Sequence, residues 1–390
     1  MNNISAKGLE KFSPERFELG EAIEAPQGIL VRSSQLASAD IGKELLAVGR
    51  AGAGVNNIPV DEMTDKGIVV FNTPGANANA VKELVMTGLL LSQRGIIEGI
   101  DFVNSLSRFG DGGSESDKAE LNSLIEANKK KYKGSELKGK TLGVLGLGAI
   151  GSMVAEMALQ MGMRVLGYDP ALSVEAAWRL PSQVKKMDNM QSLFSNSDIV
   201  TLHVPALEST LNLINQESLS CFRQGAVLLN FSRAQIVNES DIELALDEGR
   251  ISQYISDFPS LTLIGKPGVI STPHLGASTM EAEENCAMMV ADQMIDFLEN
   301  GNIHNAVNFP KVSLERTDGY RITFTNKNVP RILGSVLSIL ADKNINVIDM
   351  LNRSLGDIAY NIIDIEVKPA IDLEAEILKI DGVINVRLFI

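Results

Sequence analysis

The stretch Gly146-Leu147-Gly148-Ala149-Ile150-Gly151 decides the fold of this chain of 390 residues. It follows the apolar run Thr141–Leu145, which we predict to be a buried strand, and precedes a predicted helix over residues 152–161. A second predicted strand, Arg164–Tyr168, ends at Asp169. The order strand, glycine-rich turn, helix, strand, acid is typical of a dinucleotide-binding βαβ unit. Its first glycine makes the tight turn, the second admits the pyrophosphate to the backbone N–H groups, and the third lets helix and strand pack closely.

Asp169 indicates which dinucleotide is bound. Its carboxylate is placed to accept hydrogen bonds from the adenosine ribose hydroxyls, and it would repel a 2′-phosphate. No Arg or Lys follows it directly, so NAD is favoured over NADP. The alternative is a purely structural glycine turn, which would not require an acid at this place.

Composition narrows the class of protein. The net charge of −14 argues against a general binder of nucleic acid or of an acidic membrane. The two cysteines, Cys221 and Cys286, lack the spacing of metal ligands, so we expect free thiols and no metal. The first residues have no apolar signal core, and no apolar run reaches spanning length. We therefore expect a cytoplasmic protein without a membrane partner.

The alternation of strands and helices predicts an α/β protein built on a Rossmann-type doubly wound parallel sheet. We expect an NAD-binding domain over residues 89–276 and a discontinuous substrate-binding domain over residues 1–88 and 277–308. A helix from about Met280 to Glu299 would return the chain to its first region. The polar, Gly- and Ser-rich residues 107–119 are predicted to form a loop.

Residues 319–390 have a different order of predicted strands and helices. Their pattern predicts strand, helix, two strands, helix and strand, which is the βαββαβ order of a ferredoxin-like module. The module is small and poor in reactive side chains, so we expect no catalysis in it.

Two side chains near the expected cofactor edge fit the chemistry of a hydroxy acid. Oxidation of an alcohol needs a base, and an α-carboxylate is best held by a bidentate cation. His274 and Arg233 each follow a predicted strand at the carboxyl edge of the sheet, where ligands bind in open α/β folds. The alternatives are an inert buried histidine and a surface salt bridge. We expect His203 to be structural and His304 to be solvated.

Five segments carry a resemblance to a known family: VGRAGAGVNNIPV (48–60), GIVVFNTPGAN (67–77), residues 134–170, FSRAQIVNE (231–239) and TPHLGAST (272–279). The chain resembles the D-isomer-specific 2-hydroxyacid dehydrogenases, in the branch that acts on 3-phosphoglycerate, and its last module resembles an ACT regulatory domain. The resemblance implies NAD-dependent oxidation of 3-phospho-D-glycerate to 3-phosphohydroxypyruvate, the first step of L-serine biosynthesis. It also implies a flavodoxin-like substrate domain, a homodimer or homotetramer, and L-serine as an effector.

The resemblance assigns roles to individual residues. His274 would be the acid/base and Arg233 would hold the substrate carboxylate. The other substrate-binding residues would be Arg50, Gly52, Ala53 and Gly54. The cofactor-binding residues would be Thr73, Gly146, Gly148, Ala149, Ile150, Gly151, Asp169, Val204, Pro205, Phe231, Ser232, Asp257, His274 and Gly276. An effector would contact Asn326, Asn328 and Asn346.

The chain also departs from the family pattern. Thr262 stands where the family has the glutamate that supports the catalytic histidine, and no acid occurs between Asp257 and His274. His274 is therefore supported by Asp257, by a carboxylate of another segment, or by none. In the last module Asn326 replaces a histidine. Two other functions stay open, a glyoxylate or hydroxypyruvate reductase of the same family and a non-catalytic NAD-sensing regulatory protein.

Overall fold

A computed structural model describes residues 4–107, 114–369 and 372–389. The chain forms two compact units, Met1–Asn77 with Thr279–Ile390 (unit 1) and Ala78–Ser278 (unit 2). Helix α3 (Ala78–Gln93) spans the expected domain limit at residue 88 and lies wholly in unit 2, because Val85 and Leu89 are buried in that unit's core. The division into three domains stays a prediction.

Unit 2 is built on one parallel sheet. Its seven strands have the order β10-β9-β8-β7-β4-β5-β6. The strands are β4 (Thr141–Leu145), β5 (Arg164–Tyr168), β6 (Lys185–Lys186), β7 (Ile199–Leu202), β8 (Ala226–Asn230), β9 (Ile251–Ser256) and β10 (Val269–Ser271). The helices are α3, α4 (Ile96–Ser105), α5 (Glu115–Asn128), α6 (Ala149–Gln160), α7 (Val174–Trp178), α8 (Met190–Ser195), α9 (Gln216–Ser220) and α10 (Glu239–Asp247). The strand order reverses between β4 and β7, so the turn after β4 lies at the topological switch point, where such sheets bind ligands.

The sequence explains why β4 is central. All five of its residues are buried, as expected of a strand covered on both faces of a parallel sheet. At Gly143 an added Cβ would lie 2.3 Å from the Ser197 hydroxyl oxygen, so a larger residue would push the neighbouring loop away. The predicted doubly wound α/β fold is confirmed.

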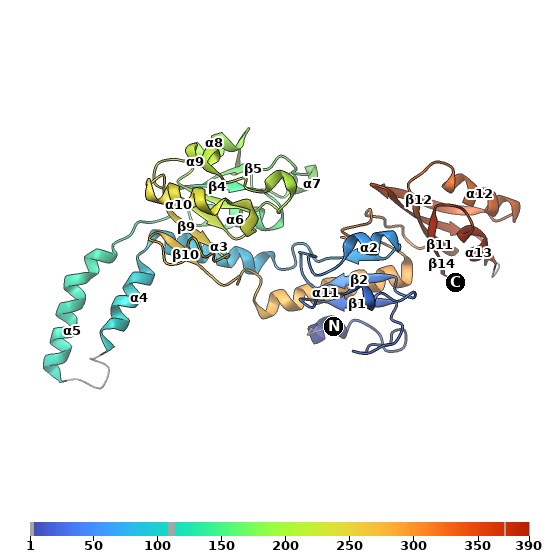
Figure 1. Cartoon of the computed structure of the whole chain (residues 1–390), viewed down its shortest axis with the longest axis horizontal. Coiled ribbons are helices and arrows are strands. Elements are labelled where there is room, and N and C mark those ends of the chain that lie inside the picture. The colour runs from blue at the N-terminus through green and yellow to red at the C-terminus, as the bar shows by residue number, and fades with distance from the viewer. Residues whose placement is uncertain (1–3, 108–113, 370–371, 390) are drawn as a thin grey trace. The chain divides into compact units, whose positions relative to one another are not determined.

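Helices α4 and α5 extend from unit 2 (Figure 1). Helix α4 packs on the short 3-10 helix Lys129–Tyr132, where the rings of Phe102 and Tyr132 lie 5.6 Å apart. The prediction of a loop over residues 107–119 is wrong from Glu115 onward, because Ser114 begins α5 with a capping box that includes Asp117. Residues 108–113 of that predicted loop lie outside the described residues.

Unit 1 contains a smaller parallel sheet. Among the described residues it has three strands in the order β1 (Gly28–Val31), β2 (Ala47–Arg50) and β3 (Val69–Phe71), so the substrate region is smaller than a complete flavodoxin-like sheet. The helices α1 (Ala6–Leu9), α2 (Val60–Asp65) and α11 (Met280–Asn300) accompany this sheet. The expected return of the chain to its first region through α11 is confirmed.

The antiparallel sheet at the end of unit 1 has the order β12-β13-β11-β14. Its elements are β11 (Tyr320–Lys327), α12 (Ile332–Asp342), β12 (Val347–Leu355), β13 (Ile358–Ile365), α13 (Leu373–Leu378) and β14 (Val383–Phe389), the predicted βαββαβ order. Two arginines of this sheet reach the carboxyl end of α11. Arg387 donates hydrogen bonds to the carbonyl oxygens of Phe297 and Leu298, and Arg321 donates to that of Asn300. Cations at the C-terminal end of a helix are stabilising, so these contacts fix the module to α11.

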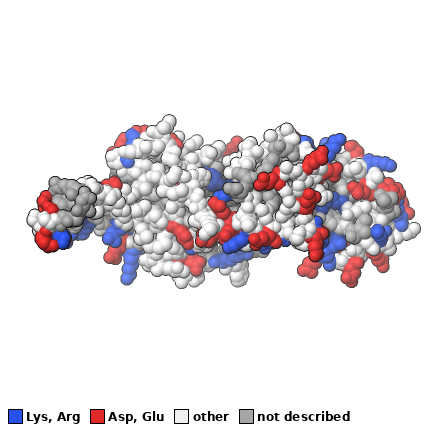
Figure 2. All heavy atoms as spheres, turned by 90° about the horizontal axis from the view of Figure 1, so that it is seen from below, with Lys and Arg blue, Asp and Glu red and all other residues white. Residues whose placement is uncertain are grey.

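Three ion pairs also join the N-terminal segment to α11. Lys7 pairs with Glu284, Lys11 with Asp292 and Arg16 with Glu299. Figure 2 shows acidic and basic side chains interspersed on the face that it draws. No helix of the described residues is long and apolar enough to cross a membrane.

Candidate active site

The glycine-rich turn has the space that a pyrophosphate requires. An added Cβ at Gly151 would lie 1.9 Å from the carbonyl oxygen of Gly146, and one at Gly146 would lie 2.7 Å from that of His203. At Gly148, the residue that precedes α6, an added Cβ would meet nothing within 4 Å, and no described side chain caps the helix. Ala149 and Ile150 form the first turn of α6. There is therefore room for a ligand beside the start of α6. The first N–H groups of a helix have no partner within the helix and attract anions, so this place suits a pyrophosphate.

Asp169 closes the turn and lies beside a pocket. Its carboxylate accepts hydrogen bonds from the backbone nitrogens of Leu147, at 2.8 Å, and Ala171, at 2.9 Å. The pocket has a volume of about 870 Å³ and is lined by Leu147, Asp169 and side chains of α7. A carboxylate that ties the turn to the end of β5 at the rim of such a pocket suits recognition of an adenosine ribose.

Trp178 is a residue that the sequence analysis missed. It lies on α7, lines the same pocket and is 85% exposed. An exposed tryptophan at a pocket rim offers an aromatic face to a ligand. The available signal was an aromatic residue nine positions after Asp169 in a segment otherwise made mostly of small and aliphatic residues.

The segment after β8 is held by Asn230, which is fully buried. The Asn230 amide donates to the carbonyl oxygen of Arg233 and accepts from the backbone nitrogen of Ser232. Ser232 also donates through its hydroxyl to the carbonyl oxygen of Val204. Val204, Ser232 and Arg233 are thus brought together at the carboxyl edge of neighbouring strands, with Pro205 and Phe231 adjacent to them in sequence.

Asp257 organises the loop that carries His274. Its buried carboxylate accepts hydrogen bonds from the Thr272 hydroxyl at 2.6 Å and from the backbone nitrogens of Leu275 and Gly276, both at 2.7 Å. The backbone of His274 is left-handed, with φ of 58°. Its backbone nitrogen donates a hydrogen bond to the backbone carbonyl oxygen of Asp257. The carboxylate therefore supports the backbone of the loop that carries His274, and no hydrogen bond among the described residues joins it to the imidazole. Support of the imidazole by a carboxylate stays a prediction.

The ring of His274 has an aromatic neighbour. Its centroid lies 5.1 Å from that of Phe258, with an angle of 63° between the ring planes. Phe258 directly follows Asp257, so one short segment supports both the backbone and the ring of the histidine. Sequence analysis missed this role of Phe258, because aromatic side chains in loops have no distinctive pattern.

His203 is structural in its contacts. Its Nε2 lies 3.0 Å from the Thr201 hydroxyl, and its Nδ1 has no hydrogen-bond partner among the described residues. Burial lowers the pKa of His203 to about 3, so the ring is neutral near pH 7.

The expected substrate residues of unit 1 gather where its strands end. Arg50 ends β2 and donates from Nε to the carbonyl oxygen of Arg32. An added Cβ at Gly52 would lie 2.4 Å from Nη1 of Arg50. Only glycine therefore leaves room for the guanidinium at this place. Thr73, which was expected to bind the cofactor, is fully buried in the same region, and its backbone nitrogen donates to the carbonyl oxygen of Gly52. Ala53 is held by the Asn72 amide, and Gly54 follows it in the same loop. These residues and the His274 edge belong to different units.

The three expected effector residues do not meet within one chain. Asn326 is buried and accepts a hydrogen bond from the amide of Asn361. Asn328 donates to the carbonyl oxygen of Gly356, at one end of β12, whereas Asn346 precedes the other end. The nine residues of β12 span about 30 Å at the usual rise of a strand. The regulatory role of these residues stays a prediction.

Comparison with known proteins reveals likeness over nearly the whole chain. Residues 106–276 match the family model "D-isomer specific 2-hydroxyacid dehydrogenase, NAD binding domain". D-3-phosphoglycerate dehydrogenase of Haemophilus influenzae is 32% identical over 387 residues, which cover 95% of this chain and 88% of that protein. The enzyme of the same name from Methanocaldococcus jannaschii is 33% identical over 86% of this chain, which spans only 61% of that longer relative.

A solved structure agrees in fold. The NAD⁺-bound 3-phosphoglycerate dehydrogenase of Entamoeba histolytica is 28% identical, with a TM-score of 0.55 over 72% of this chain and 82% of that one. Unit 2 is therefore an NAD-binding domain, in agreement with the prediction of the cofactor.

Proposed function

Because the chain belongs to the D-isomer specific 2-hydroxyacid dehydrogenase family, we propose that it oxidises 3-phospho-D-glycerate to 3-phosphohydroxypyruvate, the first step of L-serine biosynthesis. The observation that carries this proposal is the likeness to an enzyme named D-3-phosphoglycerate dehydrogenase over 95% of the chain. In this proposal the base and the carboxylate-binding cation come from the carboxyl edge of the unit 2 sheet.

The order of strands supports a common site for Arg233, Asp257 and His274. They follow β8, β9 and β10, which are neighbours in the sheet. Because the strands are parallel, their carboxyl ends lie at one edge. A base and a carboxylate-binding cation are the pair that oxidation of a 2-hydroxy acid requires.

The residues present also fit the cofactor. The open space at Gly148 and the uncapped start of α6 suit the pyrophosphate, and Asp169 suits the ribose. Bound NAD supplies the hydride acceptor that no side chain provides. The chain contributes binding, orientation and proton transfer.

We assign the proton to His274 and the carboxylate to Arg233. A neutral imidazole takes the proton of the substrate hydroxyl during oxidation, and the imidazolium returns it during reduction. The hydrogen bonds from the loop to Asp257 fix the position of the His274 backbone, and the ring of Phe258 limits rotation of the imidazole. The amide of Asn230 holds the backbone carbonyl of Arg233. The guanidinium of Arg233 then offers a planar pair of donors to the substrate carboxylate.

Unit 1 supplies the remaining substrate contacts in this proposal. Arg50 offers a second cation, and the backbone of Ala53 and Gly54 offers N–H donors for an anionic substrate. Gly52 contributes the shape of the loop, because its own N–H donates to the carbonyl oxygen of Arg50. The glycine at position 52 is required for the observed place of the Arg50 guanidinium.

Assembly and regulation are proposed on separate grounds. Helix α4 has no buried residue among those described and exposes Ile96, Ile97, Ile100 and Val103. An exposed apolar helix face is typical of an interface, so we propose a homodimer or homotetramer. A monomer in sedimentation at micromolar concentration would contradict this.

We propose that the βαββαβ module is an ACT domain with L-serine as effector, and that the protein is cytoplasmic.

The function is tested by following NADH formation at 340 nm with 3-phosphoglycerate, lactate and glycerate as alternative substrates. We expect the highest kcat/KM for 3-phosphoglycerate. Efficient reduction of glyoxylate or hydroxypyruvate without oxidation of 3-phosphoglycerate would favour a reductase instead. NAD binding without turnover of any hydroxy acid would favour a regulatory protein.

A further inference from the structure

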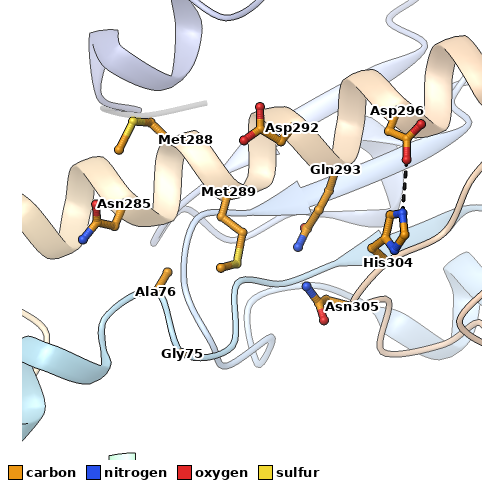
Figure 3. A pocket seen from close by; sticks show the side chains of 10 residues that line it. All are labelled: Gly75, Ala76, Asn285, Met288, Met289, Asp292, Gln293, Asp296, His304 and Asn305. Carbon is orange, nitrogen blue, oxygen red and sulfur yellow. Dashed lines mark hydrogen bonds and ion pairs between the residues drawn. The ribbon is translucent and has the colours of Figure 1, made fainter. Parts of the chain in front are cut away.

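A second pocket, of about 710 Å³, lies entirely on unit 1 (Figure 3). One wall is a face of α11, and the other is formed by Gly75, Ala76, His304 and Asn305. Its lining contains none of the residues proposed above for the substrate or the cofactor. Its volume is in the range of sites for small molecules.

Gln293 is the unusual side chain of this pocket. It is only 5% exposed, and neither Oε1 nor Nε2 has a hydrogen-bond partner among the described residues. Figure 3 shows its amide pointing from α11 toward the loop at Gly75 and toward Asn305. A buried donor and acceptor without partners are costly, and such groups are normally satisfied. A ligand that presents an acceptor and a donor side by side would satisfy both atoms at once.

The charges in the pocket select against ions. Asp292 is paired with Lys11 at 2.7 Å. Asp296 accepts hydrogen bonds from two neighbouring asparagine amides and lies 3.1 Å from Nε2 of His304. Since both carboxylates already have partners, a cationic ligand would gain little. A phosphate or carboxylate would find no lysine or arginine among the lining residues to pair with. A neutral ligand fits best.

The remaining lining favours a flat ligand. Met289 projects from α11 toward the loop of Gly75 and Ala76 (Figure 3), and Met288 also lines the pocket. Thioethers make favourable contacts with aromatic rings and adapt to their shape. The other free groups of the lining are the amides of Asn285 and Asn305, which are neutral hydrogen-bonding groups as well.

We infer that this pocket binds a small, neutral, planar molecule whose carboxamide-like edge pairs with the amide of Gln293. An aromatic primary carboxamide and a nucleobase share this chemistry, because each presents a donor beside an acceptor. The inference goes beyond the proposed dehydrogenase reaction and uses none of its residues.

The test uses the full-length protein with ¹³C-methyl-labelled methionine, titrated separately with nicotinamide and with adenosine. The Met289 methyl signal, assigned through Met289→Leu, reports on the pocket. We expect a saturable shift with at least one probe. Methyl nicotinate, which has a ring of the same size but no N–H donor, should bind at least about tenfold more weakly than nicotinamide.

Matched variants separate the pocket from the cofactor site. Gln293→Met should weaken binding about tenfold or more, whereas Gln160→Met, at the exposed end of α6, should leave it unchanged. Adenosine is also the part of NAD that Asp169 would hold, so the adenosine shift must persist in Asp169→Ala. For nicotinamide, the loss in Gln293→Met distinguishes the pocket from the cofactor site, because Gln293 is not a cofactor residue. A response to nicotinamide alone identifies a carboxamide, and a response to adenosine alone identifies a nucleobase.

Four results would overturn the inference: no shift of the wild-type signal with either probe, binding of methyl nicotinate as tight as that of nicotinamide, equal binding by Gln293→Met, or loss of the adenosine shift in Asp169→Ala. If Gln293→Met fails to fold, the wild-type titration and the comparison with methyl nicotinate still decide. Failure here would leave NADH formation from 3-phosphoglycerate unaffected, so the two proposals fail independently.

Discussion

The imidazole of His274 packs edge-on against the ring of Phe258, with 5.1 Å between the ring centroids. The backbone of the same loop is held separately, by hydrogen bonds to the carboxylate of Asp257. The position of Thr262 had suggested a histidine without the usual carboxylate. In its place the structure gives the imidazole an aromatic support.

This relationship predicts the effect of Phe258→Leu. An edge-to-face aromatic contact contributes about 0.5–1.5 kcal/mol, so its loss should let the imidazole rotate and lower kcat by about tenfold. The KM for NAD should not change, because Phe258 acts on His274 and not on the cofactor. Phe258→Tyr should restore most of the loss. Unchanged kcat in Phe258→Leu would show that the ring contact does not position the histidine.

Asp169→Ala should reduce the preference for NAD over NADP. The variant loses a charged acceptor for the ribose hydroxyls and the repulsion of a 2′-phosphate, together about 1–3 kcal/mol in the ratio of kcat/KM values. Steady-state kinetics with both cofactors measure this ratio. Equal use of both cofactors by the wild type would refute the role of Asp169.

The glycine-rich turn illustrates what sequence can predict. Gly146, Gly151 and Asp169 act locally, through backbone contacts within one βαβ unit, and their pattern therefore appears in the sequence. Most strands of unit 2 and the βαββαβ order followed from apolar runs in the same way. The short edge strand β6 was not predicted, because Lys185 and Lys186 are charged and exposed.

Other features depended on contacts between distant segments. The pairing of Phe258 with His274 and the support of Arg233 by Asn230 depend on how loops fold over the sheet edge. The start of α5 lies within a predicted loop because its capping box is made of Ser114 and Asp117, which are residue types that loops also favour. How the two units divide the chain depended on packing of α3, which the periodicity of that helix alone does not reveal.

His203 should make unit 2 sensitive to acid. Burial lowers the folded-state pKa to about 3, whereas the unfolded chain takes up the proton near pH 6.5. Stability is therefore complete above pH 6.5 and is lost as the pH falls toward the folded-state pKa. Between pH 7 and pH 5 the loss should be about 2 kcal/mol.

Urea unfolding of the wild type and of His203→Gln at both pH values measures this effect. The variant should lack that part of the pH dependence. An identical pH dependence in the two proteins would show that His203 is not the group responsible.

Asp364→Asn should destabilise the C-terminal module strongly. Burial acts to raise the pKa of Asp364, but hydrogen bonds and the charge of Arg321 outweigh it and hold the pKa below its ordinary value. The pair is almost completely buried, with Nε of Arg321 2.6 Å from the carboxylate. Removal of one partner leaves a buried charge unpaired, at about 3–5 kcal/mol.

Thermal and denaturant unfolding measure this cost, with Asp381→Asn on an exposed turn as the matched control. The stabilisation by Asp364 is present above pH 3.8 and lost as the pH falls through its lowered folded-state pKa. If both variants unfold like the wild type, the buried pair does not hold the module.

The most direct test of the proposed mechanism is the oxidation of 3-phosphoglycerate by His274→Ala. As the general acid/base, His274 should contribute roughly 10²–10⁴-fold to kcat, so the variant should lose activity by that factor. Its affinity for NAD should remain close to that of the wild type, because the glycine-rich turn and Asp169 are unchanged. A variant that oxidises 3-phosphoglycerate at nearly the wild-type rate would contradict the assignment of His274 and with it the proposed mechanism.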